Sequence, residues 1–429
     1  LITTKSRIQR DFDMKSLAVQ KIQLELSPLQ VAEKLANADG LIFFDSSGNL
    51  PENYKSALSI VAAFPVKYFN GNTDDFNKAR KALDGYEVER DQGVPMEIPV
   101  GGLFGGIKYD GRFSFGLYED CLVYDHSSEL WYEVGDLQQY FSDNAESQVP
   151  IQCGRFDANI SKSRYMEMVN QAKDYITAGD IYQVNLSQKF TSKVKSGDLF
   201  CLYLSLRNSA PAPMGAYLRF PDGVEVLSSS PETFLNITGD CVETRPIKGT
   251  RPRFDDKKED AASARELLES DKERAELVMI TDLERNDLGQ VCEYGTVKVE
   301  EMLKLETLEH VYHLVSTVTG KIKSELDHFD VVDFCFPGGS ITGAPKVRAM
   351  EIINELESVP RGYYTGALGY IGIGGVSQFS IIIRTLVREG DEIHYHVGAG
   401  IVADSSALAE YEETLHKAKG MLKACGINA

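Results

Sequence analysis

Residues 364–397, YTGALGYIGIGGVSQFSIIIRTLVREGDEIHYHV, contain three strand-like segments separated by short turns that carry glycine. The segments Tyr364–Ile373, Phe379–Val387 and Ile393–Val397 are rich in β-branched and aromatic residues, a composition typical of strands. Connections this short join antiparallel neighbours, whereas parallel strands need a crossover of a dozen or more residues. The stretch therefore predicts antiparallel hairpins rather than a doubly wound parallel sheet.

The rest of the chain combines further strand-like segments with helical ones. Strands are also expected at Leu41–Phe44, Leu58–Phe64, Gly101–Tyr109 and Ile181–Ser187, and around a hairpin turn at Gly239-Asp240. Helices are expected between Ser161 and Gly179, over one long charged segment at Ala261–Asp287, and at Ala407–Ala424. We therefore expect mixed or antiparallel sheets covered by helices.

A polar and irregular segment, Asp136–Arg155, is the best position for a boundary within the chain. It separates an N-terminal strand-rich region, expected over residues 14–150, from a second region expected over residues 158–425. The whole chain has 429 residues, which is enough for about two or three domains or for one large fused unit.

The composition is that of an ordinary globular protein, with 43% hydrophobic and 25% charged residues. A net charge of −19 argues against a nucleic-acid partner, because a phosphate backbone binds to positive charge. The seven cysteines are scattered without a CxxC pair, which favours reduced thiols and argues against disulfides or a zinc site. No apolar run is as long as a membrane span and no signal peptide precedes Met14, so we expect a cytoplasmic protein with no membrane contact.

One lysine stands in unusual surroundings, within the stretch Glu243-Thr-Arg-Pro-Ile-Lys-Gly-Thr-Arg-Pro252. The pattern predicts a Pro/Gly turn in which Lys248 lies between Arg245 and Arg251. Such a lysine can bind an anion, or it can act as a nucleophile if nearby positive charge favours its neutral form. An isolated lysine in a turn is more often simply solvated, so this motif alone does not decide between the possibilities.

Two pairs of glutamates are spaced three residues apart on expected helices, Glu273 with Glu276 and Glu410 with Glu413. This spacing places both carboxylates of a pair on one helix face. Two such faces opposite each other would offer the oxygen ligands that Mg²⁺ prefers, although a single pair is usually just a solvated face. Lys417 follows Glu413 by one helical turn and could either neutralise these carboxylates or hold a carboxylate of a substrate.

Other residues could complete a binding site. Gly398 and Gly400 follow a strand and would allow a ligand to approach the backbone closely. Glu232 lies at the end of a strand, where burial in an apolar pocket would raise its pKa and make it a general acid. His313 and Arg384 have apolar neighbours; a lone histidine there is usually a hydrogen-bonded core residue, but an inward-facing arginine needs an anionic partner.

Taken together, these features resemble the chorismate-utilising enzymes over roughly residues 160–424. The segments that carry the resemblance, in chain order, are Gly179–Ser187, Ser230–Glu232, Pro246–Thr250, Asp282–Leu288, His313–Thr317, Thr342–Lys346, Gly398–Gly400 and Glu410–Glu413. The resemblance implies an α+β fold of two stacked, mostly antiparallel β-sheets that form a sandwich with helices on the outside, as in anthranilate synthase component I. It also makes residues 158–425 the chorismate-binding catalytic region.

The resemblance further implies roles for individual residues. Glu276 and Glu413 match direct Mg²⁺ ligands, and Glu273 and Glu410 match carboxylates that act on the metal through water. Glu232 matches the general acid that assists loss of the C4 hydroxyl. Catalytic roles are thus expected for Lys248, Glu232 and His313, and substrate-binding roles for Tyr364, Arg384, Gly398, Gly400, Lys417, Thr250 and Thr342.

Two positions indicate which reaction of the family to expect. Relatives that add water carry a lysine base at the position of Gln183, so glutamine favours ammonia as the nucleophile. Anthranilate synthases carry alanine at the position of Lys248, whereas Pro-Ile-Lys-Gly-Thr is the form found in the members that aminate C4 of chorismate. The resemblance therefore implies conversion of chorismate and ammonia to 4-amino-4-deoxychorismate, a precursor of para-aminobenzoate and folate, with Lys248 as a nucleophile at C2.

A partner and two alternatives accompany this expectation. No cysteine–histidine motif of a glutamine amidotransferase is visible, so a separate amidotransferase subunit is expected to supply the ammonia. The first alternative is anthranilate synthase component I, against which Lys248 argues. The second is a non-catalytic relative that binds chorismate or tryptophan and regulates a partner; intact Glu232, Glu276 and Glu413 argue against it.

Overall fold

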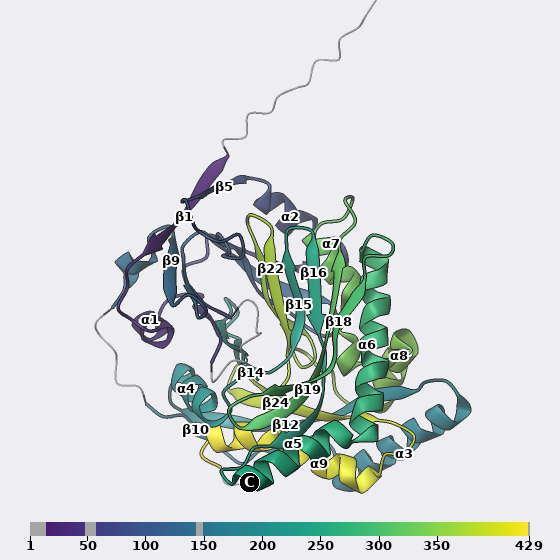
Figure 1. Cartoon of the computed structure of the whole chain (residues 1–429). Coiled ribbons are helices and arrows are strands. Elements are labelled where there is room, and N and C mark those ends of the chain that lie inside the picture. Colours follow the sequence, from purple (N-terminus) through teal and green to yellow (C-terminus); the bar gives the residue numbers. More distant parts are fainter. Residues whose placement is uncertain (1–13, 48–56, 143–148, 428–429) are drawn as a thin grey trace, which may run out of the picture.

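The computed structural model describes residues 14–47, 57–142 and 149–427. These residues form two large β-sheets that face each other, with helices packed on their outer sides (Figure 1). Neighbouring strands within the sheets run antiparallel, apart from the parallel pair that β1 forms with β5. The predicted α+β sandwich of mostly antiparallel sheets is confirmed.

The larger sheet has fourteen strands and contains segments from both ends of the chain. In spatial order its strands are β10 (Gln152–Cys153), β12 (Gln183–Ser196), β24 (Glu392–Ile401), β23 (Thr385–Glu389), β14 (Glu225–Ser230), β13 (Met214–Arg219), β2 (Ile42–Asp45), β3 (Leu58–Ala62), β8 (Cys121–Asp125), β9 (Leu130–Val134), β1 (Lys15–Ile22) and β5 (Tyr86–Arg90). The short strands β11 (Asp157–Ala158) and β20 (Gly343–Ala344) also pair with β12.

The smaller sheet has ten strands. In spatial order they are β17 (Ile247–Pro252), β19 (Val311–Lys321), β16 (Cys241–Arg245), β15 (Thr233–Thr238), β22 (Val376–Ile381), β21 (Ala367–Gly372), β6 (Gly102–Ile107), β7 (Arg112–Tyr118) and β4 (Lys67–Asn72), and β18 (Lys298–Thr307) also pairs with β19. Residues 364–397 form antiparallel hairpins as predicted, but as four strands instead of three: β21 pairs with β22 in this sheet, and β23 pairs with β24 in the larger one.

The helices cover the outer faces of the two sheets. They are α1 (Pro28–Lys34), α2 (Asn77–Leu83), α3 (Lys162–Ala178), α4 (Leu199–Ser209), α5 (Lys257–Glu269), α6 (Asp271–Val291), α7 (His328–Cys335), α8 (Lys346–Leu356) and α9 (Ala407–Ala424), with short 3₁₀ turns η1 (Thr73–Asp75), η2 (Leu137–Tyr140) and η3 (Gly339–Ile341). Apolar side chains of α1, α4 and α9 pack on the larger sheet, and α3 and α8 also contact strands of that sheet, whereas α6 packs on β17, β18 and β19 of the smaller one. A third apolar layer lies between the sheets, where Phe104 and Tyr370 meet Val123 and Val226.

Local signals in the sequence fix several helix ends. Ser161 caps α3 by accepting a hydrogen bond from the backbone N–H of Arg164, and Gly179 ends that helix with a left-handed φ of 83°. Both ends agree with the prediction, as do the bounds of α9.

Three local predictions are wrong. The segment Phe379–Val387 is not one strand, because β22 ends at Ile381 in the smaller sheet and β23 begins at Thr385 in the larger one. The segment 261–287 is not one helix, because α5 ends at Glu269 and the side chain of Ser270 accepts a hydrogen bond from the backbone N–H of Glu273, which starts α6. Lys248 does not lie in a turn: it belongs to β17, whose pairing with β19 shifts register between Lys248 and Thr250. Gly249, at φ 72°, occupies this bulge, where a left-handed conformation favours glycine.

The two sequence regions share both sheets. Strand β2 pairs with β13 in the larger sheet, and β6 pairs with β21 in the smaller one. The division into residues 14–150 and 158–425 stays a prediction, and part of the expected boundary, residues 143–148, lies outside the described residues.

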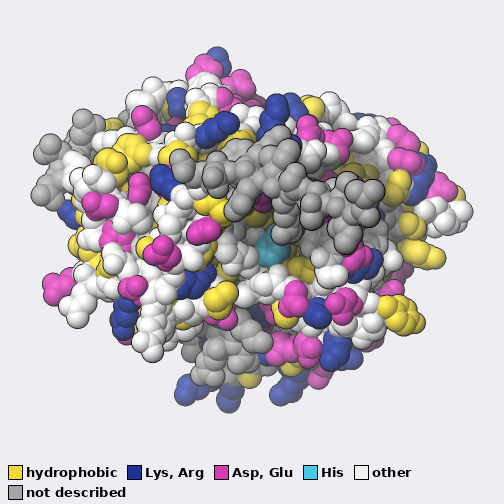
Figure 2. Space-filling model, turned by 90° about the horizontal axis from the view of Figure 1, so that it is seen from above, with side chains coloured by type: hydrophobic (Ala, Val, Ile, Leu, Met, Phe, Trp, Pro, Cys, Tyr) yellow, Lys and Arg dark blue, Asp and Glu magenta, His cyan; other side chains and the backbone are white. Residues whose placement is uncertain are grey.

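Acidic and basic side chains intermingle on the face seen in Figure 2, without a continuous basic stripe among its described residues. In the described part of the chain, no helix combines the length and the apolar character needed to cross a bilayer.

Candidate active site

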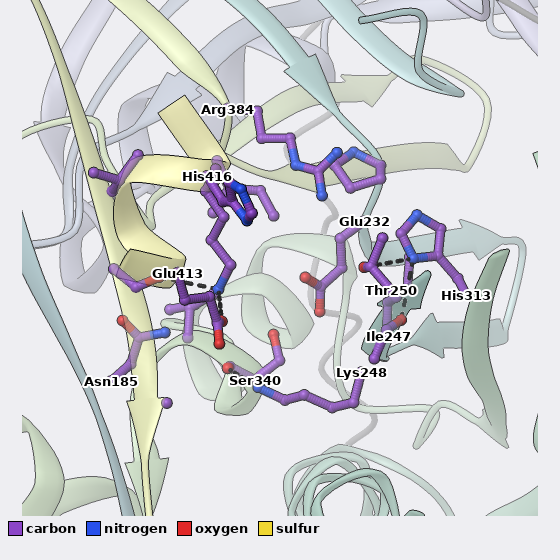
Figure 3. Close-up of a pocket in the computed structure, with 18 of the residues that line it drawn as sticks. Asn185, Glu232, Ile247, Lys248, Thr250, His313, Ser340, Arg384, Glu413 and His416 are labelled. Carbon is purple, nitrogen blue, oxygen red and sulfur yellow. Dashed lines mark hydrogen bonds and ion pairs between the residues drawn. The ribbon is translucent and has the colours of Figure 1, made fainter. Parts of the chain in front are cut away.

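A cavity of about 510 Å³ lies where β17, α6 and η3 approach α9 and the end of β24. Nearly all of the predicted site residues line it (Figure 3), namely Glu232, Lys248, Thr250, Glu273, Glu276, His313, Tyr364, Arg384, Gly398, Gly400, Glu413 and Lys417. They come from distant parts of the sequence, and the two sheets with their helices bring them together. The volume and the convergence of polar groups are those of a site for a small molecule.

Lys248 extends from the bulge of β17 across the cavity, and its Nζ donates a hydrogen bond to the carbonyl oxygen of Ser340 at 3.2 Å. The flanking arginines point to other partners. Arg245 forms a buried ion pair with Glu306, and Arg251 contacts Glu266 at 2.9 Å. Each arginine is therefore matched by a carboxylate, and the positive charges expected to act on Lys248 are largely neutralised.

Glu232 is buried between Lys248 and Arg384, and its carboxyl group points into the cavity. Burial raises the pKa of Glu232, while the side chain of Ser340 and the charge of Lys248 partly offset that rise. A carboxyl group of this kind retains its proton at a higher pH than an exposed one. Its position and its raised pKa suit the predicted role of general acid.

His313 and Thr250 lie side by side in the wall of the cavity. Its Nδ1 is 3.1 Å from the hydroxyl of Thr250 and 3.3 Å from the carbonyl oxygen of Gly249. Burial, together with the charge of Arg384, lowers the pKa of His313 to about 4. The ring is therefore neutral near pH 7, with Nδ1–H directed at these oxygens, and its buried Nε2 has no hydrogen-bond partner among the described residues. This nitrogen is available to a ligand.

Two cations and a glycine form a pocket suited to carboxylates. Arg384 has a left-handed φ of 51°, and its guanidinium forms no ion pair with any described residue; burial lowers its pKa and the charge of Glu232 raises it. Lys417 donates to the carbonyl oxygen of Gly398 at 3.0 Å and pairs with Glu413 at 2.7 Å. A Cβ atom on Gly398 would lie 2.7 Å from the hydroxyl of Tyr364, so only glycine keeps this surface open.

The acidic side of the cavity is formed by Glu273 and Glu276 of α6 and Glu413 of α9. Burial raises the pKa of Glu276, and the nearby lysines Lys248 and Lys272 oppose that rise. Within residues 14–47, 57–142 and 149–427, no three His, Cys, Asp or Glu side chains gather closely enough to hold a metal ion by themselves. A divalent cation here would take its remaining ligands from water and substrate, which is common for Mg²⁺.

Two predicted site residues do not line the cavity. Thr342 is fully buried behind it, and its hydroxyl donates to the carbonyl oxygen of Gly338 at 3.0 Å. Glu410 accepts a hydrogen bond from the hydroxyl of Ser405 at 2.7 Å and lies 3.6 Å from Lys272. Thr342 thus supports the η3 turn, and Glu410 faces the start of α9 rather than the cavity.

Several lining residues were missed. Ser340 and Lys272 line the cavity, as does Asn185, whose buried Oδ1 has no partner among the described residues. The Ser270-x-x-Glu273 pattern, a known signal for a helix start, would have placed Lys272 in the first turn of α6.

Gln183 is 1% exposed, and neither its Oε1 nor its Nε2 has a described partner. Its Nε2 would lie 2.7 Å from a Cβ atom on Gly400, so the amide adjoins the cavity.

The fold and this cavity define a chorismate-binding enzyme. The sequence profile of the chorismate binding enzyme family matches residues 78–423, most of the chain, and the chain belongs to that family.

Individual relatives carry out more than one reaction of the family. The chain is 41% identical to aminodeoxychorismate synthase component 1 of Bacillus subtilis over 330 residues, which cover 72% of this chain and 70% of that protein. It is 45% identical to anthranilate synthase component 1 of Streptomyces coelicolor over 267 residues, 62% of this chain but only 52% of that protein. The crystal structure of anthranilate synthase component I from Streptococcus pneumoniae superposes with a TM-score of 0.75 at 28% identity and covers 98% of this chain and 100% of that one.

Proposed function

We propose that the protein is an aminodeoxychorismate synthase component I, which converts chorismate and ammonia to 4-amino-4-deoxychorismate and water. The observation that carries this proposal is the position of Lys248: its side chain lines the cavity next to the buried carboxyl group of Glu232. A nucleophile and a general acid in one cavity are what a two-step substitution requires.

In the first step, the amine of Lys248, after loss of its ammonium proton to solvent, attacks C2 of chorismate and forms a C–N bond. The ring double bonds shift, and the bond from C4 to its hydroxyl breaks. Glu232 donates its proton to the departing hydroxyl, which leaves as water. The Arg384 guanidinium and the Lys417 ammonium would hold carboxylates of the substrate, since both line the cavity.

In the second step, ammonia attacks C4, the double bonds shift back, and the bond between C2 and Lys248 breaks. This step needs no side chain that deprotonates water. Gln183 fits that requirement, because it places a neutral amide without a described partner beside the cavity. An amide can orient a nucleophile by hydrogen bonding but is not a base near neutral pH.

Mg²⁺ is the proposed cofactor, and the donor set fits it. Glu276 and Glu413 would bind the ion directly and Glu273 through water, since all three carboxylates line the cavity. Glu410, the fourth residue expected from the sequence, would act only indirectly from its position next to Ser405. When bound, Mg²⁺ would screen the charge of a substrate carboxylate.

We expect Glu276→Gln to raise the Mg²⁺ concentration that gives half-maximal activity by at least about tenfold, because an amide is a weaker ligand than a carboxylate. The measurement is a magnesium titration of turnover at saturating chorismate. Glu269→Gln, which changes an exposed carboxylate at the end of α5, is the matched control and should titrate like the wild type. An unchanged curve for Glu276→Gln would refute the ligand assignment.

The proposal includes a separate glutamine amidotransferase subunit as the source of ammonia and a cytoplasmic location for the reaction. Free ammonia should replace that subunit in vitro. The reaction can therefore be tested with this chain alone.

Product identity tests the proposed function directly. The chain is incubated with chorismate, MgCl₂ and an ammonium salt at mildly alkaline pH, and the products are separated by chromatography with mass detection. A peak of 4-amino-4-deoxychorismate that an added lyase converts to 4-aminobenzoate supports the proposal. Fluorescent anthranilate with release of pyruvate would support the alternative, which relatives of comparable similarity keep open. No turnover under any condition would favour a non-catalytic relative.

A further inference from the structure

Glu284 is a buried carboxyl group that the proposed reaction leaves without a role. It belongs to α6, is 4% exposed and does not line the cavity. Its Oε1 accepts a hydrogen bond of 3.1 Å from the backbone N–H of Gly339, the first residue of η3. A buried carboxyl group aimed at one backbone N–H fixes the position of that backbone.

The η3 turn, which Glu284 holds in this way, contacts both Lys248 and Glu232. Ser340 follows Gly339 directly, and its carbonyl oxygen accepts the hydrogen bond from Nζ of Lys248 at 3.2 Å. Its side chain interacts with the carboxyl group of Glu232 and lowers the pKa of that group. In the close-up view, Ser340 lies between the two residues (Figure 3). A small shift of η3 would therefore displace both.

Close packing fixes η3 against α6. A Cβ atom on Gly339 would lie 2.6 Å from Cδ2 of Leu283 and 3.0 Å from Oε1 of Glu284, so no other residue fits here without displacement. From the other side, the hydroxyl of Thr342 donates to the carbonyl oxygen of Gly338 at 3.0 Å. Glu284 and Thr342 together restrain η3 from two sides.

We propose that Glu284 is a positioning residue: through the N–H of Gly339 it holds Ser340 where that residue orients Glu232 and Lys248 for reaction. The proposal rests on the proposed function in that it takes Glu232 and Lys248 as the reacting groups. Its immediate consequence is a dependence of turnover, rather than of chorismate binding, on the hydrogen bond between Glu284 and Gly339.

The charge of Glu232 also affects Glu284. Burial and the charge of Asp287 raise the pKa of Glu284 to about 8, Lys346 opposes the rise, and Glu232 adds to it. The groups that face Glu284 are Asp287 on α6, Lys346 on α8, Cys335 on α7, Glu232 and the N–H of Gly339. Because the charge of Glu232 raises the pKa of Glu284, Glu284 keeps its proton while Glu232 titrates and accepts the N–H of Gly339 as a neutral carboxyl group.

The test compares three variants in the full-length chain. Glu284→Gln keeps an oxygen that can accept from Gly339, whereas Glu284→Met fills a similar volume but cannot accept. We expect Glu284→Gln to keep kcat within about threefold of the wild type and Glu284→Met to lower it at least about tenfold, both with KM for chorismate nearly unchanged. Asp282→Asn, an exposed change on the same helix, is the control and should leave kcat unaltered.

The pH profile gives a readout that a purely structural role would not alter. Glu284→Gln is neutral like protonated Glu284, so Glu232 should titrate as in the wild type, whereas Glu284→Met should displace Ser340 and weaken the contact that lowers the pKa of Glu232. We expect the falling limb of kcat, normalised to un-ionised ammonia, to be unshifted in Glu284→Gln and to move up by about 0.5 pH unit in Glu284→Met. Equal kcat values for the Gln and Met variants together with an unshifted profile in Glu284→Met would overturn the proposal.

A double-mutant cycle keeps the test valid if Glu284→Met folds poorly. Ser340→Ala removes the side-chain contact with Glu232 without disturbing α6. If Glu284 acts through Ser340, the effects of Glu284→Gln and Ser340→Ala on kcat are not additive, whereas independent effects would contradict the proposal. Each rate is measured on whichever product the wild type releases from chorismate, so release of anthranilate would refute the proposed function without deciding this inference.

Discussion

Replacing Lys248 with alanine is expected to lower kcat for 4-amino-4-deoxychorismate formation by at least about a hundredfold, because the chain then has no nucleophile to attack C2. Chorismate should still bind with a dissociation constant within about threefold of the wild-type value, since Arg384 and Lys417 would still hold the carboxylates. Single-turnover product formation and equilibrium binding of chorismate measure the two effects separately.

Two further variants separate nucleophilic from electrostatic roles of Lys248. Lys248→Arg keeps a cation near Glu232 but offers no neutral amine, so it should be about as inactive as the alanine variant. Lys298→Ala removes an exposed lysine from β18 of the same sheet and should behave like the wild type. Full activity of Lys248→Ala would refute the covalent route, and recovery of activity in Lys248→Arg would mean that the residue supplies charge alone.

Electrospray mass spectrometry of the intact protein gives an independent check on the attack of Lys248 on C2. In the absence of ammonia, the wild-type chain should accumulate a covalent adduct with the substrate, with loss of one water, because nothing displaces Lys248 from C2. The adduct should be absent from Lys248→Ala. Ammonia is removed before chorismate is added, because ammonia would displace Lys248 from C2 and return the free enzyme before the adduct could be detected.

The sequence predicted those parts of the fold that depend on local signals. Segments rich in β-branched and aromatic residues with short glycine turns predicted antiparallel hairpins in residues 364–397, and capping residues predicted the ends of α3. These features form within short stretches of chain and need little help from distant residues. The order of strands within the two sheets depends on packing between distant segments, such as β2 with β13, and no local pattern specified it.

The difference between local signals and long-range packing also explains which site residues were predicted correctly. Spacing alone made Glu410 and Glu413 equivalent on one helix face, but the rotation of α9 on β24 turns Glu413 to the cavity and Glu410 to Ser405. Residue types alone placed Lys248 in a turn between two arginines, whereas Glu306 and the bulge at Gly249 change both its backbone and its electrostatic surroundings. Which side of an element faces the cavity is set by tertiary packing, and that information is not local.

Replacing Glu232 with glutamine is expected to lower kcat about a hundredfold to a thousandfold, the usual range for loss of a positioned general acid. Glutamine has nearly the same shape but no proton to give to the departing C4 hydroxyl. Chorismate binding should persist, because Arg384 and Lys417 are unchanged. Glu309→Gln, at an exposed carboxylate between β18 and β19, is the matched control and should leave kcat unaltered.

The pH dependence of the rate tests whether Glu232 acts as an acid. Burial raises the pKa of Glu232, so its acid form persists to a higher pH than in an exposed glutamate. The wild-type rate, divided by the concentration of un-ionised ammonia, should therefore fall as the pH rises through this raised pKa. Glu232→Gln should be slow at every pH and should lack the fall, since it has no proton to lose. If Glu232→Gln keeps the wild-type falling limb, another group supplies the proton and the general-acid assignment is wrong.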